Sequence, residues 1–161
     1  MEKITISEAQ KYTSPNSISL ICAKTPKGTT NLTAISWWTY LSNHPPMIGF
    51  AISKKSYTGE LILNSGKAVL SIPGVEIANE AYQCGCVSGR DVNKAEKFNI
   101  ILTNTAIKYP VHSKLAFVCS LENTTDVGDH TFFICKVDEV NYNCNEQQLF
   151  AWDGYSRLAP L

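Results

Sequence analysis

An excess of charge of either sign is missing from this sequence of 161 residues, which has 14 Lys and Arg and 14 Asp and Glu side chains. The formal net charge is zero, so no broad positive field exists to hold a nucleic-acid backbone, and we expect no nucleic-acid partner. A neutral surface also opposes self-association only weakly. The length predicts one domain over residues 1–161.

Secretion and membrane signals are missing as well. The N-terminal segment carries charges throughout and contains no apolar core, so we expect no signal peptide. Residues 29–53 contain no charged side chain, but His44, Pro45 and Pro46 interrupt them, which excludes a membrane-spanning helix. We therefore expect a cytoplasmic protein with no membrane partner.

Motifs for metals, nucleotides and covalent catalysis are also absent. Of the six cysteines only Cys84 and Cys86 are closely spaced, and no further ligands stand at zinc-site spacing, so we expect reduced thiols and no metal. The chain has no G-x-G-x-x-G after a strand, no P-loop and no G-x-S-x-G. These absences argue against a dinucleotide-binding Rossmann domain, a P-loop nucleotidase and an α/β-hydrolase.

Short runs of apolar and β-branched residues, bounded by turn residues, dominate what is present. They predict strands at Ile18–Lys24, Leu32–Trp38, Met47–Ile52, Ala68–Ile72, Leu115–Leu121, Phe132–Val140 and Gln148–Phe150. The two runs from Leu115 to Val140 flank an Asn/Thr/Asp/Gly segment and predict a long antiparallel hairpin.

Helical signals are few and short. Thr58–Ser65 begins at a capping residue and is followed by Gly66, and shorter patterns occupy Glu76–Cys84 and Asn93–Phe98. The balance predicts a mainly β barrel or sandwich with a few small helices. A barrel of about six strands suits this length, because closure removes exposed sheet edges.

The segment from Asn31 to Pro46 carries the first candidate site. A strand that ends before a rigid Pro-Pro turn exposes backbone donors and acceptors, with which a flat heteroaromatic ring can pair. Trp37 and Trp38 offer an apolar wall for such a planar ligand. The alternative is that both tryptophans only pack in the core or at an interface.

The segment from Ser53 to Thr58 carries the second candidate site. Hydroxyl groups, two lysines and a helix N-terminus come together there, which favours an anion such as a phosphate. The alternative is a solvated basic loop in which Thr58 only caps the helix.

Two further segments carry polar side chains without a decisive pattern. Cys84–Lys94 contains the turn Ser88-Gly89 followed by Arg90. His130 stands in the expected hairpin turn, where a histidine can donate a hydrogen bond or a proton to a ligand, although a lone turn histidine is more often only exposed.

These four segments, in this order, resemble the flavin reductase-like family, and in particular flavoredoxin and its relatives. The resemblance spans about residues 15–140. It implies a six-stranded antiparallel Greek-key split β-barrel that binds FMN, and a homodimer with FMN near the subunit interface. The sequence departs from the family at two positions. Where the family has an aromatic residue after Asp-x-Lys, this chain has Ala95, and where the family has a small residue in the strand after Gly-Asp-His, this chain has Cys135.

The resemblance also assigns roles to residues. In relatives the first segment lies along the flavin ring and ribityl chain, the second holds the phosphate, the third completes the pocket, and the histidine lies near the ring. The implied cofactor-binding residues are Ala34, Ile35, Ser36, Trp37, Trp38, Thr39, Ser53, Lys54, Lys55, Tyr57, Thr58, Cys84, Ser88, Gly89 and Lys94, with His130 as the candidate catalytic residue.

The function implied is an oxidoreductase in which NADH or NADPH delivers hydride to FMN, and electrons pass on to free flavin, a ferric complex or a redox partner protein. The alternative within the family is a flavoredoxin-like carrier without nicotinamide-dependent activity. A ligand-binding or structural barrel without flavin is the third hypothesis.

Overall fold

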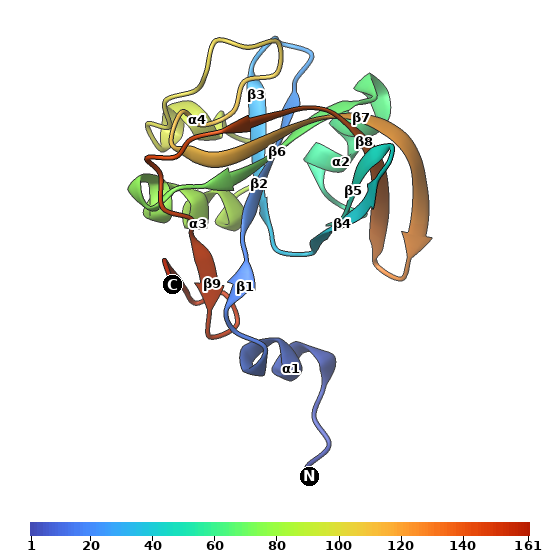
Figure 1. The fold of residues 1–161 in the computed structure, drawn as a ribbon, viewed down its shortest axis with the longest axis vertical. Coiled ribbons are helices and arrows are strands. Elements are labelled where there is room, and N and C mark those ends of the chain that lie inside the picture. The colour runs from blue at the N-terminus through green and yellow to red at the C-terminus, as the bar shows by residue number, and fades with distance from the viewer.

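Antiparallel strands make up most of the computed structural model, which describes residues 1–161 (Figure 1). The large sheet has seven strands in the order β3-β2-β6-β7-β8-β5-β4. Its strands are β2 (Ser19–Lys24), β3 (Thr30–Ile35), β4 (Trp38–Asn43), β5 (Pro46–Ser53), β6 (Lys67–Pro73), β7 (Ser113–Val127) and β8 (His130–Tyr142). The expected mainly β split barrel with few short helices is confirmed.

A small sheet lies beside the large one, in the order β1-β9-β10. It joins β1 (Asn16–Ser17) to the C-terminal hairpin of β9 (Phe150–Trp152) and β10 (Arg157–Ala159). The sequence predicts a last strand at Gln148–Phe150, and the structure moves it toward the C-terminus. In Figure 1 this sheet lies below the barrel, between it and the N-terminal helix α1 (Ile6–Tyr12).

The large sheet has more strands than expected because the run Leu32–Trp38 is broken. The chain turns at Ser36 and Trp37, so β3 ends at Ile35 and β4 begins at Trp38. β4 is a mostly exposed edge strand that pairs only with β5. Because an exposed edge strand has no apolar face to bury, its sequence lacks the pattern that predicts a strand.

The sequence analysis does not predict α1, whereas the helices that follow it agree well with their sequence signals. They are α2 (Tyr57–Ser65), the 3₁₀ turn η1 (Val75–Ile77) that leads into α3 (Ala78–Cys86), and α4 (Lys94–Lys97). Gly66 ends α2 with a φ of 67°, the left-handed conformation that glycine adopts without strain.

Both faces of the central strands are buried, which explains their continuous apolar runs. Ile21 and Leu70 face an inner core that also contains the stacked rings of Phe50 and Phe133. Leu20 and its neighbours on the opposite face contact the helices, in a second cluster that includes Ile77, Ala81 and Cys84. This packing fixes α3 against the outside of the sheet.

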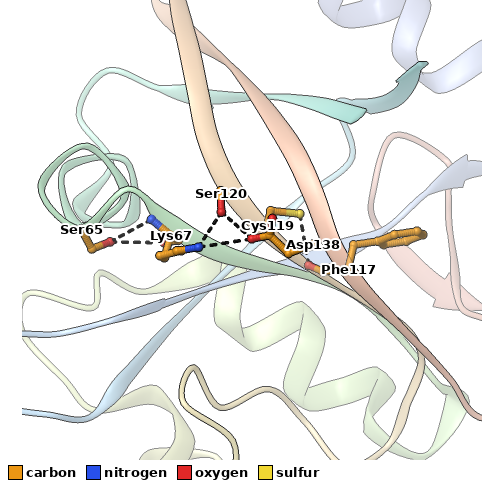
Figure 2. A network of polar contacts seen from close by, with 6 residues as sticks. All are labelled: Ser65, Lys67, Phe117, Cys119, Ser120 and Asp138. Carbon is orange, nitrogen blue, oxygen red and sulfur yellow. Dashed lines mark hydrogen bonds and ion pairs between the residues drawn. The ribbon is translucent and has the colours of Figure 1, made fainter. Parts of the chain in front are cut away.

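A polar network crosses three neighbouring strands where α2 meets β6 (Figure 2). Lys67 Nζ donates to Ser120 Oγ at 2.5 Å and lies 3.2 Å from Asp138 Oδ2, and the Ser120 hydroxyl also donates to Asp138. The hydrogen bond from Ser120, with the help of the Lys67 ammonium group, lowers the pKa of Asp138. We call Lys67, Ser120 and Asp138 the cross-strand network; it holds β6, β7 and β8 in register.

No helix of this structure is long and apolar enough to span a bilayer.

Candidate functional site

A cavity with a volume of about 490 Å³ opens between the barrel, α3 and the C-terminal hairpin. Six parts of the chain line it. They are the residue before β2 (Ile18), the end of β3 with its connection to β4 (Thr33, Ala34, Ile35, Ser36, Trp37), the end of β5 with the following loop (Ala51, Ile52, Ser53, Ser56), α3 (Ala81, Tyr82, Gly85, Cys86), the start of β8 (His130) and the C-terminal hairpin (Tyr155, Leu158).

The cavity joins regions that lie apart in the fold. In Figure 1, α3 and β9 lie on one side of β2, and α2 and β5 lie on the other. Serines and the histidine from the β5 side give the cavity polar groups, whereas α3 and the hairpin contribute mainly apolar side chains. One cavity therefore offers both polar and apolar surfaces to a ligand.

Six of the residues predicted from the sequence line this cavity: Ala34, Ile35, Ser36, Trp37, Ser53 and His130. Ala34 and Ile35 end β3, and Ser36 and Trp37 form the β3–β4 connection, in which the backbone leaves the large sheet. The Trp37 N–H group donates no hydrogen bond within the protein. The Ser36 hydroxyl is buried and has no partner either, so this connection presents unpaired polar groups at the cavity.

The loop between β5 and α2 has the features of an anion site. Ser56 is the N-cap of α2, yet its side chain makes no capping hydrogen bond, while its N–H group bonds to the Ser53 carbonyl at 2.9 Å. The first turn of a helix has N–H groups without partners inside the helix, and these carry the positive end of the helix dipole. Ser53 and Ser56 both line the cavity beside that turn.

The neighbouring lysines differ in their contacts. Lys54 forms an exposed ion pair with Asp126 at 3.3 Å. Lys55 is exposed and has no ion-pair partner in the structure. Lys55 is therefore the cation of this loop that remains available to an anion bound next to Ser56.

A buried hydrogen bond ties three of the predicted segments together. Asn31 on β3 donates to the Thr58 hydroxyl at 2.7 Å, and both residues are buried. A Cβ at Gly89 would lie 1.8 Å from the Asn31 side-chain oxygen, so only glycine fits at this position. Thr58 and Gly89 thus place the segments that carry them and do not line the cavity themselves.

Arg90 adds a second connection between α2 and the loop after α3. Its guanidinium group donates to Glu60, and it lies 5.0 Å from the centre of the Tyr57 ring. The Glu60 hydrogen bond raises the pKa of Arg90, and the same bond lowers the pKa of Glu60. Ser88 stabilises the loop by accepting a hydrogen bond from the Arg90 N–H group at 3.2 Å.

His130 begins β8 at the mouth of the cavity. Its Nδ1 lies 2.7 Å from the Asp129 carboxylate, and its ring centre lies 4.8 Å from that of Trp37. The hydrogen bond from His130 lowers the pKa of Asp129. With Nδ1 engaged, Nε2 is the ring nitrogen that remains for a ligand.

Cys84 and Lys94 form a contact of their own beneath α3. Lys94 is 2% exposed, and its Nζ donates to the Cys84 carbonyl at 2.7 Å, at the C-terminal end of the helix. Burial lowers the pKa of Lys94 and raises the pKa of the Cys84 thiol to about 11. Neither side chain lines the cavity, because both point into the packing between α3 and the loop.

The last two predicted residues, Trp38 and Thr39, belong to β4. Trp38 packs against Phe117 with ring centres 5.9 Å apart, and its indole N–H is buried without a partner. Thr39 is exposed. The structure therefore brings only part of the predicted set to the cavity wall.

Several lining residues are missing from the predicted set. Cys86 lies within the predicted segment Cys84–Lys94, and Tyr82 lies one helical turn before it on α3. Ile18, Tyr155 and Leu158 reach the cavity because β1 pairs with β9, a contact between distant parts of the chain.

The six cysteines are all free thiols, and no three His, Cys, Asp or Glu side chains are placed to hold a metal ion.

Known proteins share this sequence pattern and this fold. A family model described as "Flavin reductase like domain" matches residues 12–159. An uncharacterized protein of Pyrococcus abyssi is 34% identical over 115 residues, which cover 70% of this chain and 66% of that protein. A protein of Archaeoglobus fulgidus is 29% identical over 70% of this chain and 65% of its own length, so the match spans just under two thirds of both relatives.

A third relative and two solved structures extend the comparison. The high molecular weight rubredoxin of Moorella thermoacetica is 31% identical over 62% of this chain and 44% of that protein. Flavoredoxin from Methanosarcina acetivorans has a TM-score of 0.83 at 22% identity, covering 100% of this chain and 92% of that one. An FMN-binding protein from Thermus thermophilus has a TM-score of 0.84 at 20% identity, covering 99% and 93%.

Proposed function

This chain belongs to the flavin reductase-like family, and from that premise we propose that it is an FMN-binding oxidoreductase that uses NADH or NADPH. The observation that carries the proposal is the single cavity in which an uncapped helix N-terminus, unpaired groups of the β3–β4 connection and apolar walls meet. These are the features that a phosphate, a ring with polar edges and a planar tricycle each require.

The residues present fit FMN in kind and in size. A cavity of about 490 Å³ lies within the usual range of roughly 300–1,000 Å³ for ligand sites. Ser53, Ser56 and the first turn of α2 would hold the phosphate, with Lys55 adding positive charge. The Ser36 hydroxyl and the Trp37 N–H group would pair with the polar edge of the ring.

FMN, when bound, supplies the hydride and electron chemistry, and the protein supplies position and charge. The β3–β4 connection would stabilise negative charge on the ring through its donor groups. His130, held by Asp129 beside Trp37, would orient the ligand that approaches the ring, and its Nε2, with the Nδ1 proton on Asp129, would accept a hydrogen bond. No protein nucleophile is needed for this chemistry.

A flavoredoxin-like carrier is the second candidate, and one observation favours it. The relative from Moorella thermoacetica that matches 62% of this chain bears the name of a rubredoxin. That match supports a protein as the onward electron acceptor, in place of free flavin or a ferric complex.

Spectroscopy separates these candidates. The protein reconstituted with FMN should show the flavin absorption band after gel filtration, and a colourless product would support a barrel without flavin. The loaded protein is then mixed anaerobically with NADH or NADPH. Bleaching of the band with either donor supports the reductase, whereas a band that stays unchanged with both and bleaches with dithionite supports the carrier.

We also propose that the protein forms a homodimer. The exposed apolar residues Tyr40 and Leu41 stand on the edge strand β4, and Trp37 and Tyr82 are exposed where they line the cavity. Apolar surface of this kind is typical of an interface. Sedimentation equilibrium tests the proposal, and a monomer at micromolar concentration in the FMN-loaded state would contradict it.

Six free thiols support a cytoplasmic location, because reducing compartments preserve them.

A further inference from the structure

The C-terminal hairpin belongs to the small sheet, yet it contributes Tyr155 and Leu158 to the wall of the cavity. Both side chains also pack against the small apolar cluster of Ile18, Leu149 and Ala151. Figure 1 shows the hairpin beside α3, away from α2 and β5. The hairpin therefore adds to the cavity a lining separate from the loop of Ser53 and Ser56.

The turn of this hairpin has an uncommon backbone. Asp153, Gly154 and Tyr155 have φ values of 53°, 65° and 71°, so three successive residues are left-handed. Glycine accepts this conformation freely, but a large aromatic residue does so only at a cost in conformational energy. Such a residue persists where the surrounding structure holds it, and strain of this kind is concentrated at functional sites.

Contacts on both sides hold the turn in place. The Asp153 N–H donates to the Ser14 hydroxyl at 2.9 Å, and the Ser156 hydroxyl donates to the Asp153 carbonyl at 3.1 Å. Lys11 of α1 lies so close to Gly154 that a Cβ there would come within 2.8 Å of its side chain. The N-terminal segment therefore supports the conformation that places Tyr155 at the cavity.

The Tyr155 side chain has unused binding capacity. It is half-buried, and its hydroxyl group makes no hydrogen bond within the protein. An aromatic ring in the wall of a flavin-sized cavity offers a flat apolar surface, and its free hydroxyl offers a polar group to the same ligand.

We propose that Tyr155 is a flavin-binding residue and that its contact slows the release of FMN. The proposal rests on the FMN-binding function proposed above and adds a wall that the four sequence motifs do not include. Because interface changes act mainly on dissociation, the release rate is the quantity expected to respond.

Two substitutions in the full-length, FMN-loaded protein test the proposal. Tyr155→Ala removes the ring, and Tyr155→Gly removes the ring and the left-handed strain together. We expect both variants to release FMN at least about tenfold faster than the original chain. The apoprotein of Tyr155→Gly should melt at the same or a higher temperature, a result that a purely structural role would not give.

An exposed tyrosine of α1 provides a matched control. Tyr12→Ala removes an exposed tyrosine from α1, in the same part of the molecule, and should leave the release rate unchanged. Release from both Tyr155 variants at the original rate would overturn this inference and leave the proposed function standing. Failure of the original chain to bind FMN would overturn both. If Tyr155→Ala does not fold, Tyr155→Gly alone decides the question.

Discussion

Polar groups are hydrogen-bonded to one another in the cross-strand network, whereas several polar groups at the cavity have no partner. In the network, Lys67, Ser120 and Asp138 satisfy one another across three strands (Figure 2). At the cavity, the Ser36 hydroxyl is buried without a partner and the Ser56 side chain does not cap its helix. Since proteins normally pair their buried polar groups, a buried group left unpaired at a cavity points to a ligand site.

The strongest test of this comparison adds a charge at the uncapped helix. Ser56→Asp places a carboxylate where we expect the FMN phosphate, while aspartate remains a good N-cap residue. We expect the FMN dissociation constant to rise at least about 100-fold, or about 2.7 kcal/mol, with the melting temperature unchanged or higher. Titration of the apoprotein with FMN, monitored by fluorescence, measures the effect.

Two controls separate charge repulsion from a general loss of the site. Ser56→Asn keeps the cap without the charge and should bind FMN far more tightly than Ser56→Asp. Riboflavin lacks the phosphate, so its affinity should be the same for the original chain and for Ser56→Asp. Equal weakening of FMN and riboflavin binding would contradict a phosphate site at the N-terminus of α2.

A second test compares two lysines that the family resemblance assigns to the same cofactor. Lys94 is buried with its ammonium group on the Cys84 carbonyl, whereas Lys55 is exposed beside the anion site. Lys94→Met leaves that carbonyl unpaired and should lower the free energy of unfolding by about 2 kcal/mol. Its FMN dissociation constant should stay within about threefold of the original value, if the lysine supports structure and not the ligand.

Lys55→Met should give the reverse result. It removes an exposed charge, so the free energy of unfolding should not change measurably, and the FMN dissociation constant should rise about fivefold. Urea unfolding and FMN titration of both variants measure the two quantities. Weaker FMN binding in Lys94→Met than in Lys55→Met would show that the comparison assigns the two roles wrongly.

Much of the fold follows from local patterns. The strands that are buried on both faces, such as β2 and β6, stand out as continuous apolar runs, and Gly66 marks the end of α2. β4 was missed because an exposed edge strand has no apolar face to repeat. The small sheet was mostly missed because β1 and β10 have 2 and 3 residues and exist only through pairing with β9.

The candidate site was predictable at the level of segments but not of side chains. Three of the four motifs meet where Asn31, Thr58 and Gly89 come together, and the fourth joins them at the cavity, where His130 lies against Trp37. Packing decides which residues of each motif face the cavity. No local pattern in the sequence predicts that Lys94 lies beneath α3. Tyr155 could not be found at all, because its placement depends on a contact between the two ends of the chain.

The smallest expected effect concerns the cross-strand network itself. Hydrogen bonds from Ser120 and Lys67 favour the ionised form of Asp138, so its pKa in the folded state lies below the unfolded value. The stabilisation is therefore complete above the unfolded pKa, near 4, and is lost as the pH falls through the folded pKa. Asp138→Asn should lower the free energy of unfolding by about 0.5 kcal/mol at pH 7.

Below pH 4 the free energies of unfolding of Asp138→Asn and of the original chain should approach one another, because protonation of Asp138 removes the same contribution from the original chain. Ser120→Ala removes the main hydrogen bond to the carboxylate and should reproduce part of this change. Urea unfolding between pH 2.5 and 7, in about half-unit steps, resolves the expected convergence. FMN binding at pH 7 should be the same in all three proteins, since the network does not reach the cavity. A change in FMN affinity in Asp138→Asn would mean that the paired and unpaired regions are coupled through the strands they share.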